Sequence, residues 1–276
     1  MIPAPFEYER VEFVDHALQL LTADPEAKVL AGGHSLLPLM RLRLARPSML
    51  VDITRIADLS YVREDGDRIA IGALTRHHDL ANSELLQQEC PIVAYAASGI
   101  GDPQVRHVGT IGGSCAHADP ASDLPTVLVA LGGELVTRGP EGASRTVPAD
   151  AFFRGLFEPD LAHDEILTEI RVPKTGSRGW SYLKFHRRQM DWALVGVAAL
   201  APGRHGASVA LTNMADRPIR ATGVEEALAA GGDPGTAAER APEGTSPPSD
   251  AFASAGYRQE LVKVLARRAL EEAMSR

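Results

Sequence analysis

The chain has 276 residues, a formal net charge of -8 and a sequence pI of about 5.6. This length allows one large domain or two ordinary ones, and the acidic balance with scattered Lys and Arg argues against a nucleic-acid-binding surface. No signal peptide and no membrane-spanning apolar run is recognisable, and two cysteines are too few for a disulfide framework or for an iron–sulfur cluster with about four thiolate ligands. We therefore expect a cytoplasmic protein without a transmembrane segment, and leave open a peripheral position at the inner face of the membrane.

Short apolar strands alternate with helical patterns in the first half of the chain. Residues 28–30 are a predicted buried strand that runs into a glycine loop, and Ser35 stands where it can cap the next helix. Further strands are predicted at 50–53 and 69–71, and a helix at 84–98.

A second glycine loop, at 110–114, precedes an apolar helix that begins near Asp123. The composition changes at 174–179, which favours a domain boundary after Pro173, and residues 231–249 are rich in Gly, Pro, Ser and Ala and are predicted to form a surface loop. The remaining predicted strands are 135–136, 166–172, 182–185, 193–200 and 208–212, and the remaining predicted helices are 223–230 and 250–274.

The two Gly-Gly loops are the candidate chemical features. Glycine allows positive φ and close approach of the backbone, so that successive N–H groups can converge on phosphate oxygens. A following helix N-terminus adds partial positive charge, and two such loops could hold the two phosphates of a dinucleotide. The loops match neither the P-loop nor the Rossmann fingerprint. The residues alone leave two tight turns as the alternative.

Longer strings decide between these interpretations. AGGHSLLPLMRLRLARP and TIGGSCAHADPASDLP are followed by WSYLKFHRRQMDWALVGVAA, PIRATGVEEAL and YRQELVKVLARRALEEA. These strings, in this order, resemble the FAD-binding medium subunit of the carbon monoxide dehydrogenase and xanthine dehydrogenase family of molybdenum hydroxylases. The resemblance covers essentially the whole chain.

The resemblance implies an α+β fold. Residues 1–173 would form a two-subdomain FAD-binding domain of the PCMH type with a boundary near 55–60, and residues 174–276 a C-terminal domain of antiparallel sheet and helices. The residues that the resemblance assigns to FAD are Ala31, Gly32, Gly33, His34, Ser35, Leu36, Ile100, Thr110, Ile111, Gly112, Gly113, Ser114, Asp123, Leu167, Lys184 and Trp192.

Some of these positions carry a stated role in the resemblance. The hydroxyls of Thr110 and Ser114 would add donors to the second pyrophosphate loop, although many relatives have Asn in place of Ser114. Asp123 would accept a hydrogen bond from a polar part of the cofactor, and it could instead be a helix N-cap. Lys184 would lie near the flavin and stabilise negative charge on its reduced form. Trp192 would stack near the isoalloxazine, and it could instead be a core aromatic.

Other candidates have plainer explanations. His34 could be a turn histidine rather than a cofactor contact, and Cys115 a small buried residue. The pair His77-His78 lacks partners at metal-ligand spacing, so no metal site is predicted there. The basic residues Arg187-Arg188 and 217–220 could face a partner subunit or solvent.

The family resemblance implies a relay function. Electrons from a molybdenum cofactor on a large subunit would pass through [2Fe-2S] clusters on a small subunit to FAD on this chain, and then to an external acceptor such as quinone. The complex would be a dimer of heterotrimers, with no catalytic residue for substrate on this chain. Carbon monoxide dehydrogenase is the expected complex. The alternatives are an aldehyde or N-heterocycle hydroxylase, a self-sufficient flavoprotein oxidase, or a scaffold that binds no cofactor.

Overall fold

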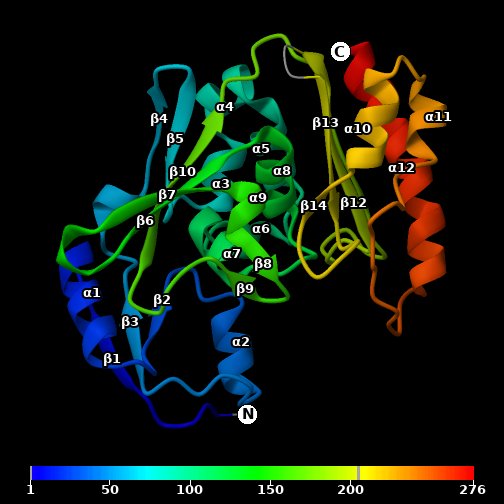
Figure 1. The fold of residues 1–276 in the computed structure, drawn as a ribbon. Coiled ribbons are helices and arrows are strands. Elements are labelled where there is room, and N and C mark those ends of the chain that lie inside the picture. Colours follow the sequence, from blue (N-terminus) through cyan, green and yellow to red (C-terminus); the bar gives the residue numbers. More distant parts are fainter. Residues whose placement is uncertain (1, 204–205) are drawn as a thin grey trace.

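The computed structural model describes residues 2–203 and 206–276, and its first lobe (residues 2–59) is a small parallel sheet with two helices (Figure 1). The strands are β1 (Glu7–Arg10), β2 (Lys28–Leu30) and β3 (Met49–Asp52), in the order β1-β3-β2. Helix α1 (Val14–Ala23) buries residues three to four positions apart against this sheet, and α2 (Leu36–Arg41) follows the first glycine loop. The end of β2 thus delivers this loop to the edge of the lobe.

The second lobe (residues 60–175) is built on an antiparallel sheet. Its strands are β4 (Val62–Asp65), β5 (Arg68–Gly72), β6 (Glu134–Arg138), β7 (Ser144–Pro148) and β10 (Ile166–Pro173), in the order β4-β5-β10-β6-β7. The central strand β10 is almost fully buried, and its pairing with β6 shifts register beside Leu167.

Helices cover one face of this second sheet. The predicted helix 84–98 is wrong in its continuity: it consists of α4 (Glu84–Glu89) and α5 (Pro91–Ser98), separated at Cys90. Pro91 lacks the N–H that an uninterrupted helix needs and instead occupies the first turn of α5. The other helices and short elements of the first two lobes are η1 (Ala57–Leu59), α3 (His77–Ala81), α6 (Pro103–Arg106), α7 (Ile111–His117), α8 (Asp123–Leu131), η2 (Pro140–Gly142), α9 (Ala149–Phe152), β8 (Phe153–Gly155) and β9 (Glu158–Pro159).

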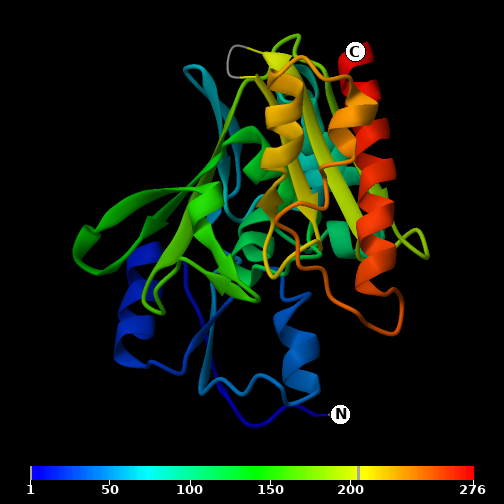
Figure 2. The same ribbon diagram turned by 45° about the vertical axis from the view of Figure 1, so that its right-hand side comes forward.

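The C-terminal unit (residues 176–276) is an antiparallel sheet with helices on one face, as Figure 2 shows. Helix α12 packs on the sheet through residues spaced three or four apart, including Val262, Ala266, Ala269 and Ala273. Its elements are β11 (Trp180–Phe185), β12 (Val195–Gly203), β13 (Gly206–Thr212), β14 (Ile219–Arg220), α10 (Thr222–Ala229), α11 (Pro234–Ala238) and α12 (Ala255–Ser275). The opposite face of the sheet covers α8, all of whose residues are buried.

Two features of this unit differ from the sequence-based expectation: a helix within the predicted loop and the start of the last helix. Residues 231–249 contain the helix α11, whose first turn Asp233 caps by accepting hydrogen bonds from the amides of Gly235 and Thr236. The last helix begins at Ala255 rather than near 250, because Ser254 accepts from the amide of Tyr257 and so caps its start.

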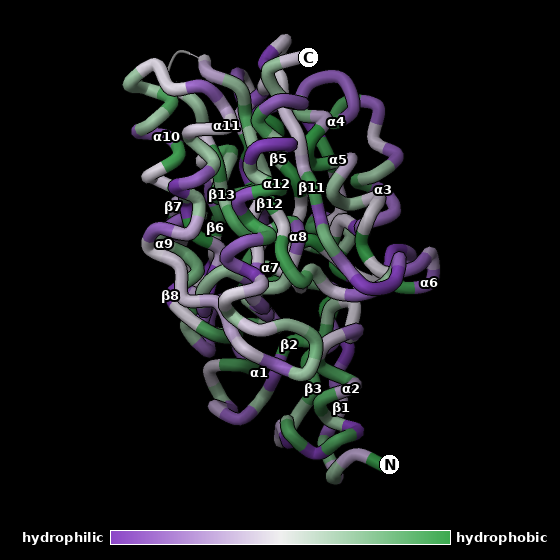
Figure 3. The backbone as a smooth tube through the Cα atoms, turned by 90° about the vertical axis from the view of Figure 1, so that its right-hand side faces the viewer, coloured by the Kyte–Doolittle hydropathy of each residue, from purple (hydrophilic) through white to green (hydrophobic). Residues whose placement is uncertain are grey.

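The three parts meet at one place. Figure 3 shows the first lobe, with β1, β2, β3, α1 and α2, below the other two. The fold is of the expected α+β class. No helix among residues 2–203 and 206–276 is long and apolar enough to cross a membrane.

Candidate cofactor site

A cavity of about 520 Å³ lies where the two lobes and the C-terminal unit meet. The first lobe contributes the loop after β2, the second lobe the start of α7 and the segment 161–167, and the C-terminal unit Lys184 and the loop residues 190–192. Cavities of this size, with apolar walls and a few polar groups, are typical of small-molecule and cofactor sites.

The first glycine loop presents free backbone donors at this cavity. Among the described residues, none accepts a hydrogen bond from the amides of Gly32, Gly33, His34 or Ser35. Gly33 has φ +72°, which turns the chain in a conformation that glycine adopts most easily. A run of unpaired amides at the entrance of a helix is a suitable cradle for phosphate oxygens.

The second glycine loop is different, because its amides from Ile111 to Ser114 are already paired. It forms the first turn of α7, where the amide of Ile111 donates to Thr75 and that of Gly112 to Ala73. The amide of Gly113 donates to Oγ1 of Thr110 at 3.1 Å. The hydroxyl hydrogens of Thr110 and Ser114 remain available as donors, so apart from the amide of Thr110 this loop offers hydroxyls rather than backbone amides.

The two loops are in close contact. A Cβ added at Gly32 would come within 2.5 Å of the carbonyl oxygen of Val108 and 2.8 Å of the Cα of Gly109. A Cβ added at Gly113 would meet only Thr110 Oγ1 at 2.9 Å and the Cβ of Ala31 at 3.9 Å. Gly32 therefore allows the first lobe to dock on the second. A side chain at Gly113 would project between the loops.

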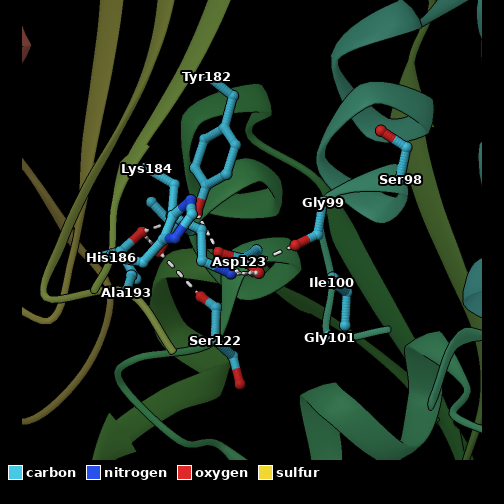
Figure 4. A network of polar contacts seen from close by, with 12 residues as sticks. Ser98, Gly99, Ile100, Gly101, Ser122, Asp123, Tyr182, Lys184, His186 and Ala193 are labelled. Atoms are coloured by element: carbon cyan, nitrogen blue, oxygen red, sulfur yellow. Dashed lines mark hydrogen bonds and ion pairs between the residues drawn. The ribbon is translucent and has the colours of Figure 1, made fainter. Parts of the chain in front are cut away.

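A buried polar network stands at the other end of the cavity. Asp123, at the start of α8, accepts from the hydroxyl of Tyr182 at 2.6 Å and forms an ion pair with Nζ of Lys184 at 2.9 Å (Figure 4). The Lys184 ammonium also lies 3.5 Å from the carbonyl oxygen of Gly99. The side chains of Asp123 and Lys184 are only 5% and 10% exposed. The carboxylate therefore joins strand β11 to α8, and the N-cap alternative is wrong, because Ser122 occupies the N-cap position and Asp123 accepts no hydrogen bond from the helix amides.

Burial controls the protonation of this network. Burial raises the pKa of Asp123, while the ion pair with Lys184 and the hydrogen bond from Tyr182 oppose the rise. Burial also raises the pKa of the Tyr182 hydroxyl well above its usual value, so that it remains a donor. The positive charge of Lys184 and the negative charge of Asp123 neutralise each other, and both residues line the cavity.

Trp192 lies at the rim of the cavity. The residue is 58% exposed, which excludes the alternative that it is a core aromatic. The base of its loop is fixed by two side chains: Asn213 donates to the carbonyl of Ala193 at 2.8 Å, and the fully buried Arg258 donates to the carbonyl of Leu194. The indole thus stands on an anchored loop with one side open.

The cavity gathers nearly all of the residues expected from the sequence. Ile111 is the exception: its side chain is fully buried in the core of the second lobe and does not line the cavity. The expected residues that do line it are Ala31, Gly32, Gly33, His34, Ser35, Leu36, Ile100, Thr110, Gly112, Gly113, Ser114, Asp123, Leu167, Lys184 and Trp192.

Several lining residues were missed. The sequence suggests a metal ligand as the only special role for His77, whereas the structure places this residue in the cavity wall. The described residues hold no group of three or more His, Cys, Asp or Glu suited to a metal ion. Glu165 also lines the cavity, with a carboxylate whose pKa Arg145 lowers through hydrogen bonds of 2.6 and 2.7 Å. No local motif marks these residues, since only the fold brings them to the loops.

Comparison with known proteins places this geometry in a family. Residues 4–175 match the family described as the FAD binding domain in molybdopterin dehydrogenase, and residues 180–273 match the CO dehydrogenase flavoprotein C-terminal domain. The carbon monoxide dehydrogenase medium chain of Hydrogenophaga pseudoflava is 40% identical, covering 100% of this chain and 99% of that one. The glyceraldehyde dehydrogenase medium chain of Sulfolobus acidocaldarius is 38% identical, covering 99% of each.

Solved structures agree with the sequence comparison. Carbon monoxide dehydrogenase from Hydrogenophaga pseudoflava, in a form lacking the Mo-pyranopterin moiety, has a TM-score of 0.94 and 41% identity, covering 100% of this chain and 99% of that one. Quinoline 2-oxidoreductase from Pseudomonas putida 86 has a TM-score of 0.94 and 30% identity with the same coverage. The family resemblance read from the sequence is confirmed. The chain belongs to the FAD-binding medium chains of molybdopterin dehydrogenases and is homologous over its full length to those of carbon monoxide dehydrogenases.

Proposed function

We propose that this chain is the FAD-carrying electron-transfer subunit of a molybdenum-dependent dehydrogenase, namely the medium subunit of an aerobic carbon monoxide dehydrogenase. The observation that carries the proposal is the run of unpaired amides at Gly32–Ser35, in a loop that lines a cavity of about 520 Å³ in a chain of this family. Bound FAD would supply the one- and two-electron chemistry that connects single-electron carriers with a two-electron acceptor.

The residues of the cavity fit such a cofactor. The amides of Gly32–Ser35 would donate to the diphosphate, and the hydroxyls of Thr110 and Ser114 would add donors from the facing loop. The Asp123–Lys184 pair would accept from and donate to polar groups elsewhere on the cofactor. Trp192 would cover the flavin from the rim.

The division of the chain follows from the same proposal. Residues 1–173 would form the FAD-binding domain, divided near 55–60, and residues 174–276 the flavoprotein C-terminal domain. The cavity has donors from all three parts, so FAD would hold them in one arrangement. Anything that binds only the folded chain stabilises it by mass action, and FAD should therefore raise its thermal midpoint.

The partners that we propose are those of the family. A large subunit would carry the molybdenum cofactor and a small subunit the [2Fe-2S] clusters, in a dimer of heterotrimers. The complex would be cytoplasmic and pass electrons to an acceptor such as quinone. Relatives are named as medium chains and as complex subunits, which supports a division of labour between chains.

Purification of the chain with its natural partners tests the proposal. We expect a large molybdenum-containing subunit and a small iron–sulfur subunit to co-purify, and carbon monoxide to bleach the flavin absorbance under anaerobic conditions. A colourless chain that co-purifies with no molybdenum protein contradicts the proposal.

A second candidate has a specific observation in its favour. The glyceraldehyde dehydrogenase medium chain at 38% identity and the nicotine 6-hydroxylase medium subunit at 35% match this chain over nearly the same length. If an aldehyde or an N-heterocycle bleaches the flavin of the purified complex and carbon monoxide does not, the chain serves a hydroxylase of that kind.

A further inference from the structure

His77 lies in the wall of the cavity, beside the segment that precedes the second glycine loop. It is the first residue of α3, and its backbone amide donates to the carbonyl of Gly109 at 2.9 Å. Its ring packs on Gly109, since a Cβ added there would come 2.9 Å from Cδ2 and 3.2 Å from Nε2 of the imidazole. Gly109 in turn touches Gly32 of the first loop. A chain of direct contacts therefore joins the imidazole to the unpaired amides.

The imidazole of His77 makes no hydrogen bond within the described part of the chain. The residue is only 5% exposed, and its Nδ1 is buried without a partner. The other nitrogen, Nε2, is not enclosed in this way, and the side chain lines the cavity. The nitrogen that a cavity ligand can reach is therefore Nε2, whereas the buried Nδ1 has no partner in either case.

The environment also fixes which nitrogen carries the hydrogen. Burial lowers the pKa of His77 to about 4, with smaller contributions from His34 and Arg106, so the ring is neutral near pH 7. A neutral imidazole has one N–H donor and one acceptor nitrogen. A hydrogen on Nδ1 would be a buried donor with no acceptor, whereas a hydrogen on Nε2 can reach a group in the cavity. The Nε2–H tautomer is therefore favoured.

We propose that Nε2 of His77 donates a hydrogen bond to a diphosphate oxygen of the bound dinucleotide. This inference rests on the proposed function and adds a side-chain donor to the backbone donors of Gly32–Ser35. This donor would lie on the side of the second loop, where the amides from Ile111 to Ser114 are already paired.

A matched pair of variants tests the donor. His77→Met and His77→Gln have similar shapes, and only glutamine offers an N–H near the position of Nε2. Binding of FAD, ADP and riboflavin to the flavin-stripped complex should be measured for both. We expect His77→Met to weaken the binding of FAD and ADP about tenfold. The affinity for riboflavin, which has no diphosphate, should stay unchanged. His77→Gln should stay within about threefold of the wild type.

The neighbouring residue supplies the control. His78 stacks on His107 with ring centroids 3.9 Å apart and does not line the cavity, so His78→Met should leave FAD affinity unchanged. If wild type and His77→Met bind FAD with equal affinity, the inference is overturned. A tenfold loss of FAD affinity in His77→Gln overturns it as well. If His77→Met does not fold, His77→Gln alone decides the test. A wild-type complex that takes up no FAD refutes the proposed function instead.

Discussion

The buried ion pair between Asp123 and Lys184 gives the sharpest quantitative prediction. Lys184→Met keeps the apolar stem and removes the ammonium, which leaves a carboxylate that is 5% exposed without its counter-charge. Removing one partner of a buried pair costs about 3–5 kcal/mol. A loss of this size lowers the thermal midpoint of a chain this long by roughly 6–20 °C.

The double variant separates charge from packing. Asp123→Asn in the Lys184→Met background removes the orphaned charge and keeps an acceptor for Tyr182, so it should restore most of the lost midpoint. Thermal unfolding of the wild type, both single variants and the double variant forms a complete cycle. A double variant no more stable than Lys184→Met would falsify the reasoning, because packing rather than an uncompensated charge would then explain the loss.

The same variant should respond to pH with a defined sign. Burial raises the pKa of Asp123 above its unfolded value of about 3.9, and losing Lys184 raises it further. A carboxyl with a raised pKa gives stability that is complete below the unfolded pKa and is lost as pH rises through the folded pKa. Lowering the pH from about 8 towards 5 should therefore reduce the difference in thermal midpoint between Lys184→Met and the wild type. A difference that grows on acidification contradicts this assignment.

Three further variants probe the cavity. Gly113→Val should abolish FAD retention by placing a side chain between the loops. The control Gly256→Val, where a Cβ meets open space, should retain a full complement of flavin. A Gly113→Val protein that purifies with bound flavin argues against the site. Lys184→Ala should lower the midpoint potential of bound flavin by removing positive charge, and redox titration showing an unchanged potential ends that role. Tyr182→Phe should lower the free energy of unfolding by about 1–3 kcal/mol, since Asp123 loses a buried donor, and an unchanged value means that water replaces the hydroxyl.

Local sequence signals predicted the elements that carry the site. The strand ending at Leu30 and the glycine pair after it place the first loop, and Gly33 does have positive φ. The sequence also contains the signal for the helix break at Cys90, since Pro91 is incompatible with a continuous helix. These features depend on residues close together in the chain.

Features that depend on distant residues could not be predicted in this way. The second loop resembles the first in sequence, yet the amides of Ile111 and Gly112 donate to the carbonyls of Thr75 and Ala73. Only the packing of α7 within the second lobe reveals this pairing. The pairing of Asp123 with Lys184 joins residues far apart in the chain. His77 becomes a cavity residue for the same reason, because it packs on Gly109, in the segment that precedes the second glycine loop.

The amides of Gly32–Ser35 are proposed to hold a diphosphate between the lobes. A crystal structure of the FAD-loaded complex tests this most directly. We predict diphosphate oxygens within hydrogen-bonding distance of these amides, with the flavin extending towards Lys184 and Trp192. FAD bound with its diphosphate away from the first glycine loop, or a complex that cannot be loaded with FAD, contradicts the account.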